Sequence, residues 1–347
     1  MEEIFSGLVR DGKAQCAAYC LSRNGKVFAD RSFGPRHHDD TEPMLPSTWR
    51  QIASVTKVLT SIGVLKLVEE GRLLMEFPVS KVLPELDTPT HGAITLEHLL
   101  THTSGIVADP GSDGEASPDR SIWETVGKAD WLSRVVALPL RTAPGEAWRY
   151  SSVGFSILGE VIARVTKEHF VHWMAREVLA PAGLKETFWD LADRPIEAFS
   201  YTSDENRQML LDRPNKLFSP FMAMGWCNST CRDMTRLGQL LVAGGTLDGK
   251  RVIGRRTVEA MTSIHVDVPA PHWGDKFSDW KYGLGVEPPR HPLVKPGSVW
   301  GHEGAGRSAM WFDRESGLSM SWTLPTLLDW DPDFGWTPRA VVLSGLM

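Results

Sequence analysis

Ser54 and Lys57 are the two residues of this sequence whose types and spacing most directly suggest chemistry. Three residues apart on a helix, the hydroxyl and the amine project from the same face. The amine can take the proton of the serine, and the helix dipole stabilises negative charge that develops near its N-terminus. Because most S-x-x-K matches are only a helix cap followed by a solvated lysine, the pair indicates a nucleophile only if other segments support it.

The element that must position this pair is a helix that begins near Ser54. Apolar residues recur at helical spacing after it, and the pattern ends at Glu69-Glu70-Gly71, where glycine is a usual helix stop. The apolar positions are Val55, Val58, Leu59, Ile62, Leu65 and Val68. We therefore expect a buried helix with Ser54 in its first turn.

A second candidate segment surrounds Tyr150, one of only four tyrosines. Pro144-Gly145 predicts a turn, and Ser151 or Ser152 is expected to cap the helix that follows. A phenol near a lysine ammonium can have its pKa lowered enough to act as a base, so Tyr150 is a candidate partner of Lys57. The alternative is a tyrosine that only packs at the entry to a helix.

The third candidate segment is Trp300–Ser308, in which three glycines flank a short predicted strand. Glycines at such a place allow the backbone to approach a ligand closely. The amide of Ala305, together with that of Ser54, is expected to form an oxyanion hole. His302 lies in the same segment, either as a site residue or as a strand-end histidine with a structural hydrogen bond.

In order and spacing, these segments resemble the active-site motifs of the serine β-lactamase-like enzymes. The three motifs are Ser54-Val-Thr-Lys57, Tyr150-Ser-Ser152 and His302-Glu-Gly304. Four further segments resemble other signatures of the family, namely Leu99–Gly105, Pro144–Gly154, Ser229–Leu240 and Tyr282–Gly285. The branch that the chain resembles comprises class C β-lactamases, D-alanyl-D-alanine carboxypeptidases and family VIII carboxylesterases, and the resemblance spans most of the sequence.

The resemblance implies a role for each matched residue. The expected catalytic residues are Ser54, Lys57 and Tyr150, of which the lysine and the tyrosine share the role of general base. The expected oxyanion hole consists of the amides of Ser54 and Ala305. The expected substrate-binding residues are Ser152, His302, Glu303 and Gly304. The resemblance implies no cofactor and no metal.

Two departures from the family's motifs concern the substrate. Ser152 stands where the family usually has asparagine, whose carboxamide bonds the lysine and the acyl amide of the substrate. His302-Glu303 stands where class C β-lactamases have Lys-Thr. A cation suited to a substrate carboxylate is thus replaced by an imidazole that is mostly neutral at pH 7 if its pKa is ordinary. Both changes favour esters or unusual amides over antibiotics and cell-wall peptides.

The first expectation is therefore a serine hydrolase with an acyl-enzyme on Ser54, a carboxylesterase for small or aromatic, apolar acyl esters. One alternative is an acyltransferase or an amide-forming, cyclising enzyme of secondary metabolism. Others are a weak β-lactamase or D-amino-acid peptidase or amidase, and a non-catalytic ligand-binding relative. An α/β-hydrolase is disfavoured because no G-x-S-x-G segment surrounds any serine. The expected partner is a small-molecule ester or amide.

Strand-like segments gather at both ends of the chain, and helical patterns occupy the middle. The predicted strands are 14–21, 26–32, 282–286, 298–300, 307–313 and 318–324. The first two meet at Asn24-Gly25, a strong hairpin signal. We predict an α+β fold in which both chain ends form an antiparallel sheet flanked by helices. The predicted sheet domain is 1–80 and 266–347, the mainly helical domain is 81–265, and the active site lies at their junction.

Composition excludes several classes of protein. The 347 residues carry a net charge of −6 without a basic patch, so neither nucleic acid nor an anionic membrane is an expected partner. No apolar run reaches the about 18 residues of a membrane span. The start, Met1-Glu2-Glu3-Ile4, lacks the features of a signal peptide, so we expect a cytoplasmic protein. The sequence does not specify an oligomeric state.

Three groups of residues have spacings that resemble metal sites, and for each we expect another explanation. The groups are Cys16/Cys20 with Cys227/Cys231, His98/His102, and His37-His38-Asp39-Asp40. The cysteines are four residues apart, whereas structural zinc sites more often use C-x-x-C, so we expect small buried side chains. The histidine pair lies in a segment that the resemblance makes structural. The loop cluster is expected to be solvated.

Overall fold

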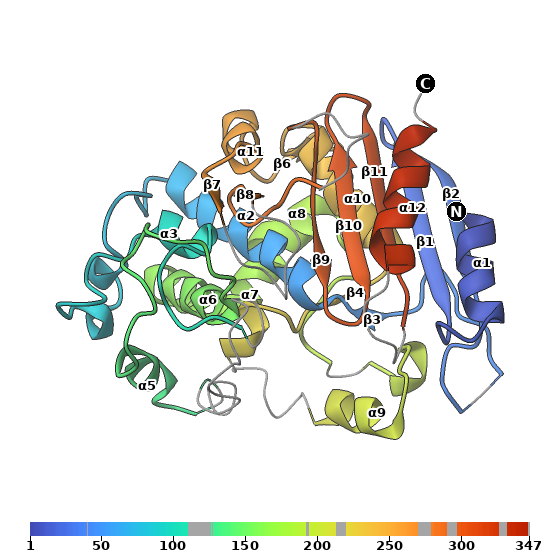
Figure 1. The fold of residues 1–347 in the computed structure, drawn as a ribbon, viewed down its shortest axis with the longest axis horizontal. Coiled ribbons are helices and arrows are strands. Elements are labelled where there is room, and N and C mark those ends of the chain that lie inside the picture. The colour runs from blue at the N-terminus through green and yellow to red at the C-terminus, as the bar shows by residue number, and fades with distance from the viewer. Residues whose placement is uncertain are drawn as a thin grey trace.

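A five-stranded antiparallel sheet forms the centre of the fold, and both ends of the chain contribute strands to it (Figure 1). The computed structural model describes residues 1–39, 41–109, 126, 128–191, 194–212, 220–269, 279–289, 297–325 and 332–345. In spatial order the strands are β2 (Lys26–Phe33), β1 (Ala17–Arg23), β11 (Leu318–Thr323), β10 (Ser308–Asp313) and β9 (Val299–Gly304). Each neighbouring pair is antiparallel. The predicted α+β class, with a sheet built from both chain ends, is confirmed.

The turn between β1 and β2 falls at Asn24-Gly25, where the sequence predicted a hairpin. Both residues have positive φ angles, +50° and +79°, which asparagine and glycine adopt more easily than other residues. The Gly25 N–H also donates to Gln239 Oε1 at 2.8 Å. This bond ties the hairpin to a helix that packs on the sheet.

That helix is α10 (Cys231–Val242), and it lies along one face of the sheet. Thr235 Oγ1 donates to the carbonyl O of Cys20 in β1, and Ser319 Oγ in β11 donates to that of Thr235. A Cβ atom on Gly238 would lie 2.1 Å from Ser319 Oγ, so glycine permits this close approach. The predicted division placed α10 in the helical domain, whereas its contacts are with the sheet; the two-domain division itself stays a prediction.

Helices α1 (Glu2–Arg10) and α12 (Pro332–Ser344) cover the opposite face of the sheet (Figure 1). The buried apolar side chains between these helices and the strands include Phe5, Leu8, Tyr19, Trp311 and Trp322. Helix α12 is not among the elements predicted from the sequence. A helix near each end of the described chain therefore packs on the same face of the sheet.

On the β9 side of the sheet, the helices gather around α2 (Thr56–Glu69), the predicted buried helix (Figure 1). Every residue of α2 from Thr56 to Leu65 is buried, and Gly71 follows its end with φ of +67°. The other helices are α3 (Leu96–Leu100), α5 (Trp131–Val136), α6 (Ser152–Thr166), α7 (Phe170–Met174), α8 (Ala180–Ala182), α9 (Asp204–Leu211) and α11 (Arg255–Met261). A π-helical turn, Ala175–Leu179, joins α7 to α8. In the described part of the chain, no helix is long and apolar enough to cross a membrane.

Short elements complete the fold. Two-stranded ladders are formed by β3 (Arg50–Gln51) with β4 (Asn228–Ser229), β5 (Thr246–Leu247) with β6 (Lys250–Arg251), and β7 (Val266–Pro269) with β8 (Asp279–Tyr282). Single 3₁₀ turns lie at Ala53–Val55, Val79–Lys81, Pro84–Leu86, Ile196–Ala198 and Pro220–Ala223. The strand predicted at 282–286 is wrong beyond Tyr282. There the chain turns, with Gly285 at φ +74° and the Gly283 N–H donating to Val286 O.

Candidate active site

Ser54 lies in the 3₁₀ turn Ala53–Val55, which leads directly into α2. Ala53 has φ of +44°, a left-handed conformation that is uncommon for a non-glycine residue and often occurs at functional turns. Ser54 is partly exposed, whereas the helix that follows is buried. Its N–H belongs to the first turn, where helical geometry provides no acceptor. The predicted nucleophile therefore stands at the accessible start of a buried helix.

The side chain of Lys57 is buried beside Ser54. Its Nζ donates to Ser54 Oγ at 3.0 Å and to the carbonyl O of Met224 at 2.8 Å. Burial lowers the pKa of Lys57 to about 8, and the Asp109 carboxylate opposes part of this shift. An amine with this pKa is mostly protonated at pH 7 and becomes a base just above it. The structure thus brings together the pair that the S-x-x-K spacing predicted.

The carbonyl that accepts from Lys57 belongs to a segment that the sequence did not single out. Residues 222–227 run along the start of α2, where Thr60 Oγ1 donates to Ala223 O at 2.6 Å. Gln51 Nε2 donates to Gly225 O at 3.1 Å on the other side of Met224. These two bonds hold the Met224 carbonyl opposite the lysine. A backbone acceptor leaves no residue-type signal in a sequence.

Tyr150 ends the loop before α6, and its ring centroid lies 5.0 Å from Lys57 Nζ. Its hydroxyl is hydrogen-bonded to the side chains of Ser54 and Ser152. Burial, and then the charge of Asp109, raise the pKa of Tyr150 well above its ordinary value, and the two hydrogen bonds offset only part of this. The prediction of a lowered pKa is therefore wrong. Tyr150 is a neutral phenol in the resting site because burial and the charge of Asp109 both disfavour the loss of its proton.

The ring of Tyr150 is packed against other rings, of which His102 is one. The His102 ring centroid lies 4.3 Å from that of Tyr150 and 5.1 Å from that of Tyr282. His102 has φ of +59°, and its Nδ1 accepts the Ser151 N–H at 3.1 Å. Ser151 Oγ in turn accepts the Gly154 N–H and so caps α6, as predicted. His102 therefore holds the second motif in place through its hydrogen bond to Ser151 and its contact with the Tyr150 ring.

His302 in β9 is buried next to Tyr282. Its Nε2 lies 3.1 Å from the Tyr282 hydroxyl, and its Nδ1 lies 2.6 Å from the carbonyl O of Glu303. Burial, with the charge of Lys57 as the second cause, lowers the pKa of His302 to about 3. The imidazole is therefore neutral at pH 7, and its partner Tyr282 is a site residue that the sequence identified only by a family signature.

The β9–β10 turn lies against the 3₁₀ turn that carries the nucleophile. Ser308 Oγ donates to Ile52 O at 2.7 Å. A Cβ atom on Gly304 would lie 2.5 Å from Ile52 O and 3.0 Å from Ala53 Cβ, so only glycine allows this approach. Ala305 follows Gly304 directly and is exposed. This packing supports the predicted oxyanion hole, which stays a prediction.

Glu303 differs from the other residues of the third motif. It follows His302 on β9, so the two side chains point to opposite faces of the sheet. Its carboxylate Oε1 lies 3.2 Å from Nη1 of Arg339 in α12, and the buried guanidinium lies 4.3 Å from the centroid of the Trp311 ring. Glu303 therefore forms a salt bridge on this face of the sheet, and its predicted contact with substrate stays a prediction.

Ser152 is hydrogen-bonded to Asp109, a residue that the sequence analysis did not single out. Ser152 Oγ donates to Asp109 Oδ2 and the Ser152 N–H donates to Oδ1, both at 2.6 Å. The Asp109 N–H donates in turn to the carbonyl O of Tyr150 at 2.8 Å. Burial raises the pKa of Asp109, while the charge of Lys57 and the bonds from Ser152 lower it. The second motif therefore carries a carboxylate that its sequence does not contain. Residues 110–125, which follow Asp109 in the sequence, lie outside the described residues.

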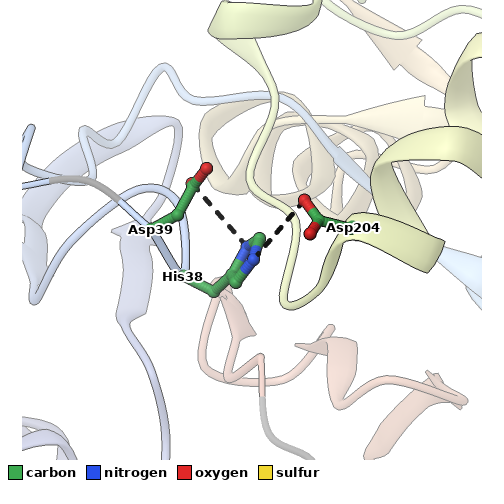
Figure 2. A group of neighbouring side chains, drawn as sticks. All are labelled: His38, Asp39 and Asp204. Atoms are coloured by element: carbon green, nitrogen blue, oxygen red, sulfur yellow. Dashed lines mark ion pairs between the residues drawn. The ribbon is translucent and has the colours of Figure 1, made fainter.

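Two residues of the predicted His37-His38-Asp39-Asp40 group lie beside an aspartate from another segment at the protein surface. His38 and Asp39 meet Asp204 of α9, and Figure 2 shows the two carboxylates on either side of the imidazole. His38 Nδ1 lies 3.7 Å from Asp39 Oδ1, and His38 Nε2 lies 3.7 Å from Asp204 Oδ1. All three residues are exposed, and acidic groups of this kind are common without an ion. Asp40 lies outside the described residues.

The other two metal-like groups have structural partners. The four cysteines are buried free thiols, and Cys231 Sγ donates to the carbonyl O of Ala18 at 3.4 Å. His98 Nδ1 accepts the Thr95 N–H at 3.2 Å in a capping box at the start of α3. Within the described residues, neither group gathers the three ligands that would suggest a metal site.

The chain is similar to known proteins in sequence and in fold. Residues 1–332 match the family model described as Beta-lactamase. Protein Rv1367c of Mycobacterium tuberculosis (strain ATCC 25618 / H37Rv) is 28% identical over 321 residues, which cover 84% of this chain and 80% of that one. Two solved structures share the fold at lower identity. A family VIII carboxylesterase has a TM-score of 0.78 at 22% identity and covers 99% of this chain and 94% of its own. EstCE1, described as a hydrolase with promiscuous acyltransferase activity, has a TM-score of 0.80 at 18% identity and covers 99% and 97%.

Proposed function

The chain belongs to the beta-lactamase family, and we propose that it is a carboxylesterase that forms an acyl-enzyme on Ser54. The observation that carries the proposal is the 3.0 Å hydrogen bond from the buried Lys57 Nζ to Ser54 Oγ. A serine beside an amine of lowered pKa, at the start of a buried helix, is an activated nucleophile. The fold shared with a family VIII carboxylesterase supports the same reaction class.

In the proposed reaction, Ser54 Oγ attacks the ester carbonyl and its proton leaves for a base in the site. Above about pH 8 the neutral amine of Lys57 is that base. The amides of Ser54 and Ala305 stabilise the oxyanion. The leaving alcohol recovers the proton, and an acyl-enzyme remains. A water molecule then attacks the acyl carbon by the same steps and releases the acid.

The charges of the site favour a substrate without a carboxylate. The third motif presents a neutral imidazole, because burial holds the pKa of His302 at about 3. The second motif adds the Asp109 carboxylate beside Ser152. A substrate carboxylate, as in β-lactams or D-alanyl peptides, would meet a neutral imidazole instead of a lysine at the third motif and would approach the like charge of Asp109. Esters of uncharged acyl groups avoid both costs.

A panel of substrates tests the proposed function. We expect the purified chain to hydrolyse p-nitrophenyl esters of short and aromatic acids, with no measurable turnover of nitrocefin or of D-Ala-D-Ala peptides. An added alcohol such as butanol reports on acyl transfer, because it would divert part of the acyl group from water into a new ester. Rapid nitrocefin turnover without ester turnover would contradict the proposed carboxylesterase activity.

Gly304→Ala is expected to reduce the kcat for ester hydrolysis by at least about tenfold, since misplacing a site by about 1 Å can cost 100-fold. The added methyl group would meet Ile52 O and Ser308 Oγ at 2.5 Å and push β9 from the nucleophile's turn. Steady-state kinetics and thermal unfolding measure the two effects. Gly7→Ala in α1 is the control, because its nearest neighbour lies at 3.5 Å. Wild-type kinetics in Gly304→Ala would show that the contact does not position the site.

A further inference from the structure

A chain of hydrogen-bonding side chains extends from the nucleophile to Asp109. Lys57 Nζ donates to Ser54 Oγ at 3.0 Å. The Tyr150 hydroxyl is hydrogen-bonded to the side chains of both Ser54 and Ser152. Ser152 Oγ then donates to Asp109 Oδ2 at 2.6 Å. Two hydroxyl groups thus connect the attacking oxygen to a carboxylate.

The groups at the two ends of this chain fix the direction of every proton in it. An ammonium group can only donate hydrogen bonds, and an ionised carboxylate can only accept them. Each of the three hydroxyl groups between them has one proton to donate. The arrangement that satisfies all of them has Ser54 donating to Tyr150, Tyr150 to Ser152, and Ser152 to Asp109. Each proton then already points toward the oxygen that would receive it.

We propose that Asp109 is the terminal proton acceptor of a relay that runs from Ser54 through Tyr150 and Ser152. The relay rests on the proposed acyl-enzyme mechanism and adds a route for its proton. As the bond from Ser54 Oγ to the carbonyl carbon forms, the carbonyl π pair moves onto oxygen. The Ser54 proton passes to the Tyr150 oxygen, the Tyr150 proton to Ser152, and the Ser152 proton to Asp109. On collapse of the intermediate, the Asp109 proton returns to Ser152, the Ser152 proton returns to Tyr150, and the Tyr150 proton passes to the leaving alkoxide.

The relay gives the site a base at pH values where Lys57 is protonated. With a pKa of about 8, Lys57 is mostly an ammonium group at neutral pH and cannot accept a proton. Tyr150 has a pKa raised well above 10 and does not exist as a phenolate there. A concerted relay needs neither form. Burial raises the pKa of Asp109 and makes it a stronger base than an exposed aspartate, while the Lys57 ammonium remains beside the developing negative charge.

The relay also accounts for a serine in place of the expected asparagine at position 152. A hydroxyl group can accept one proton while it donates another, so it passes a proton on without changing its own state. A carboxamide can do this only through an imidic acid tautomer. Ser152 therefore weakens the expected contact with a substrate amide and completes a path to Asp109 instead.

Other titratable groups lie next to the hydrogen-bonded side chains of the relay, and their charges must stay constant in a test. His102 and His302 lie next to the Tyr150 ring, Tyr282 belongs to the same buried cluster, and the charge of Glu287 acts on the Tyr150 hydroxyl. His302, with a pKa of about 3, and Tyr282, whose pKa burial raises well above 10, both stay neutral between about pH 6 and pH 9. Because all four are present in wild type and variants alike, differences between the proteins report on the relay.

Ser152→Ala tests the relay with Ser152→Thr as its matched control. Alanine removes the hydroxyl group but keeps the backbone N–H that donates to Asp109 Oδ1, and threonine keeps both donors. We measure kcat/KM for a p-nitrophenyl ester from about pH 6 to pH 9, with a proton inventory in H₂O–D₂O mixtures. Ser152→Ala should lose about 100-fold in kcat/KM at pH 6 and much less at pH 9, where neutral Lys57 serves as base. Wild type and Ser152→Thr should show curved inventories at pH 6.

Asp109→Asn supplies a second reading, because it removes the acceptor and keeps the shape. It should lose the curved proton inventory. Because the Asp109 charge raises the pKa of Lys57, the kcat/KM of Asp109→Asn should also rise at a lower pH than that of Ser152→Ala. The relay is overturned if Ser152→Ala or Asp109→Asn keeps the wild-type pH profile and curved inventory. The proposed function fails differently: wild type itself would then neither hydrolyse esters nor react with a fluorophosphonate at any pH.

Discussion

Ser54→Ala is expected to abolish ester hydrolysis, with a fall in kcat of about 10⁴-fold or more, as when a serine hydrolase loses its nucleophile. The substitution removes the only atom that can form the acyl-enzyme in the proposed mechanism. Alanine fits the 3₁₀ turn, and Ser54 is partly exposed, so the fold should be unaffected. Steady-state kinetics measure the loss, and intact-protein mass spectrometry after treatment with a fluorophosphonate shows whether the adduct has gone.

Ser263→Ala is the matched control for that experiment, because Ser263 is also accessible but lies just after α11, outside the proposed site. This variant should keep both the activity and the mass shift of one probe molecule. An adduct that persists in Ser54→Ala would place the reactive serine elsewhere. Loss of the adduct without loss of ester turnover would show that Ser54 reacts with the probe but does not carry the reaction.

The parts of the site that could be predicted from the sequence are those with local signals. Apolar residues at helical spacing and Gly71 predicted α2, and Asn24-Gly25 predicted the first hairpin. The glycines around His302 predicted a close backbone approach, and Gly304 lies where a Cβ atom would meet Ile52 O. In each case the residue type itself has a conformational or packing consequence that does not depend on distant parts of the chain.

The interactions that set the charges of the site could not be predicted in this way. Asp109 accepts a hydrogen bond from Ser152, which lies 43 residues later in the chain, so no local pattern predicts this contact. The pKa of Tyr150 depends on how deeply the ring is buried, and a sequence shows neighbours in the chain but not depth. The ammonium of Lys57 suggested a lowered pKa for Tyr150, whereas burial reverses the direction.

The role of Glu303 also depended on an element that the sequence did not reveal. Helix α12 has a proline inside it, Pro338, which argues against a helix in any local reading. Yet this helix brings Arg339 to the face of the sheet opposite His302, where it pairs with Glu303 over Trp311. The salt bridge of this motif residue thus joins β9, the strand that carries His302, to α12.

Lys57→Met is expected to lower kcat/KM by about 10³-fold and to raise stability at neutral pH. The activity falls because the site loses its base above about pH 8 and, below it, the ammonium group that bonds Ser54 Oγ. Stability rises because the native state no longer buries a charge. Moving the lysine pKa from 10.5 to about 8 costs the folded protein about 3 kcal/mol at pH 7.

The sign of this effect gives it a pH signature. Between about pH 8 and pH 10.5 the native state has released the Lys57 proton and the unfolded chain still holds it, so wild-type stability from this group rises with pH. Lys57→Met lacks that rise. The variant is therefore more stable than wild type by the full amount below pH 8, and this difference in stability disappears by about pH 10.5. Leaving Met224 O without its donor costs about 1–2 kcal/mol, so the net gain at pH 7 is about 1–2 kcal/mol.

Chemical denaturation at pH 7 and near pH 10 measures this gain, with Lys66→Met as the matched control. Lys66 lies on the same helix but is partly exposed and paired with Glu70 and Glu177, so its loss should change neither kcat/KM nor the pH dependence of stability appreciably. A Lys57→Met variant that is less stable than wild type at pH 7 would mean that the ammonium is well solvated or better paired than its burial indicates. In that case Lys57 would keep an ordinary pKa, and the base above neutral pH would have to be Asp109 alone. The expected outcome instead separates two effects of Lys57. Its charge supports the reaction at Ser54, and the burial of the same charge destabilises the fold.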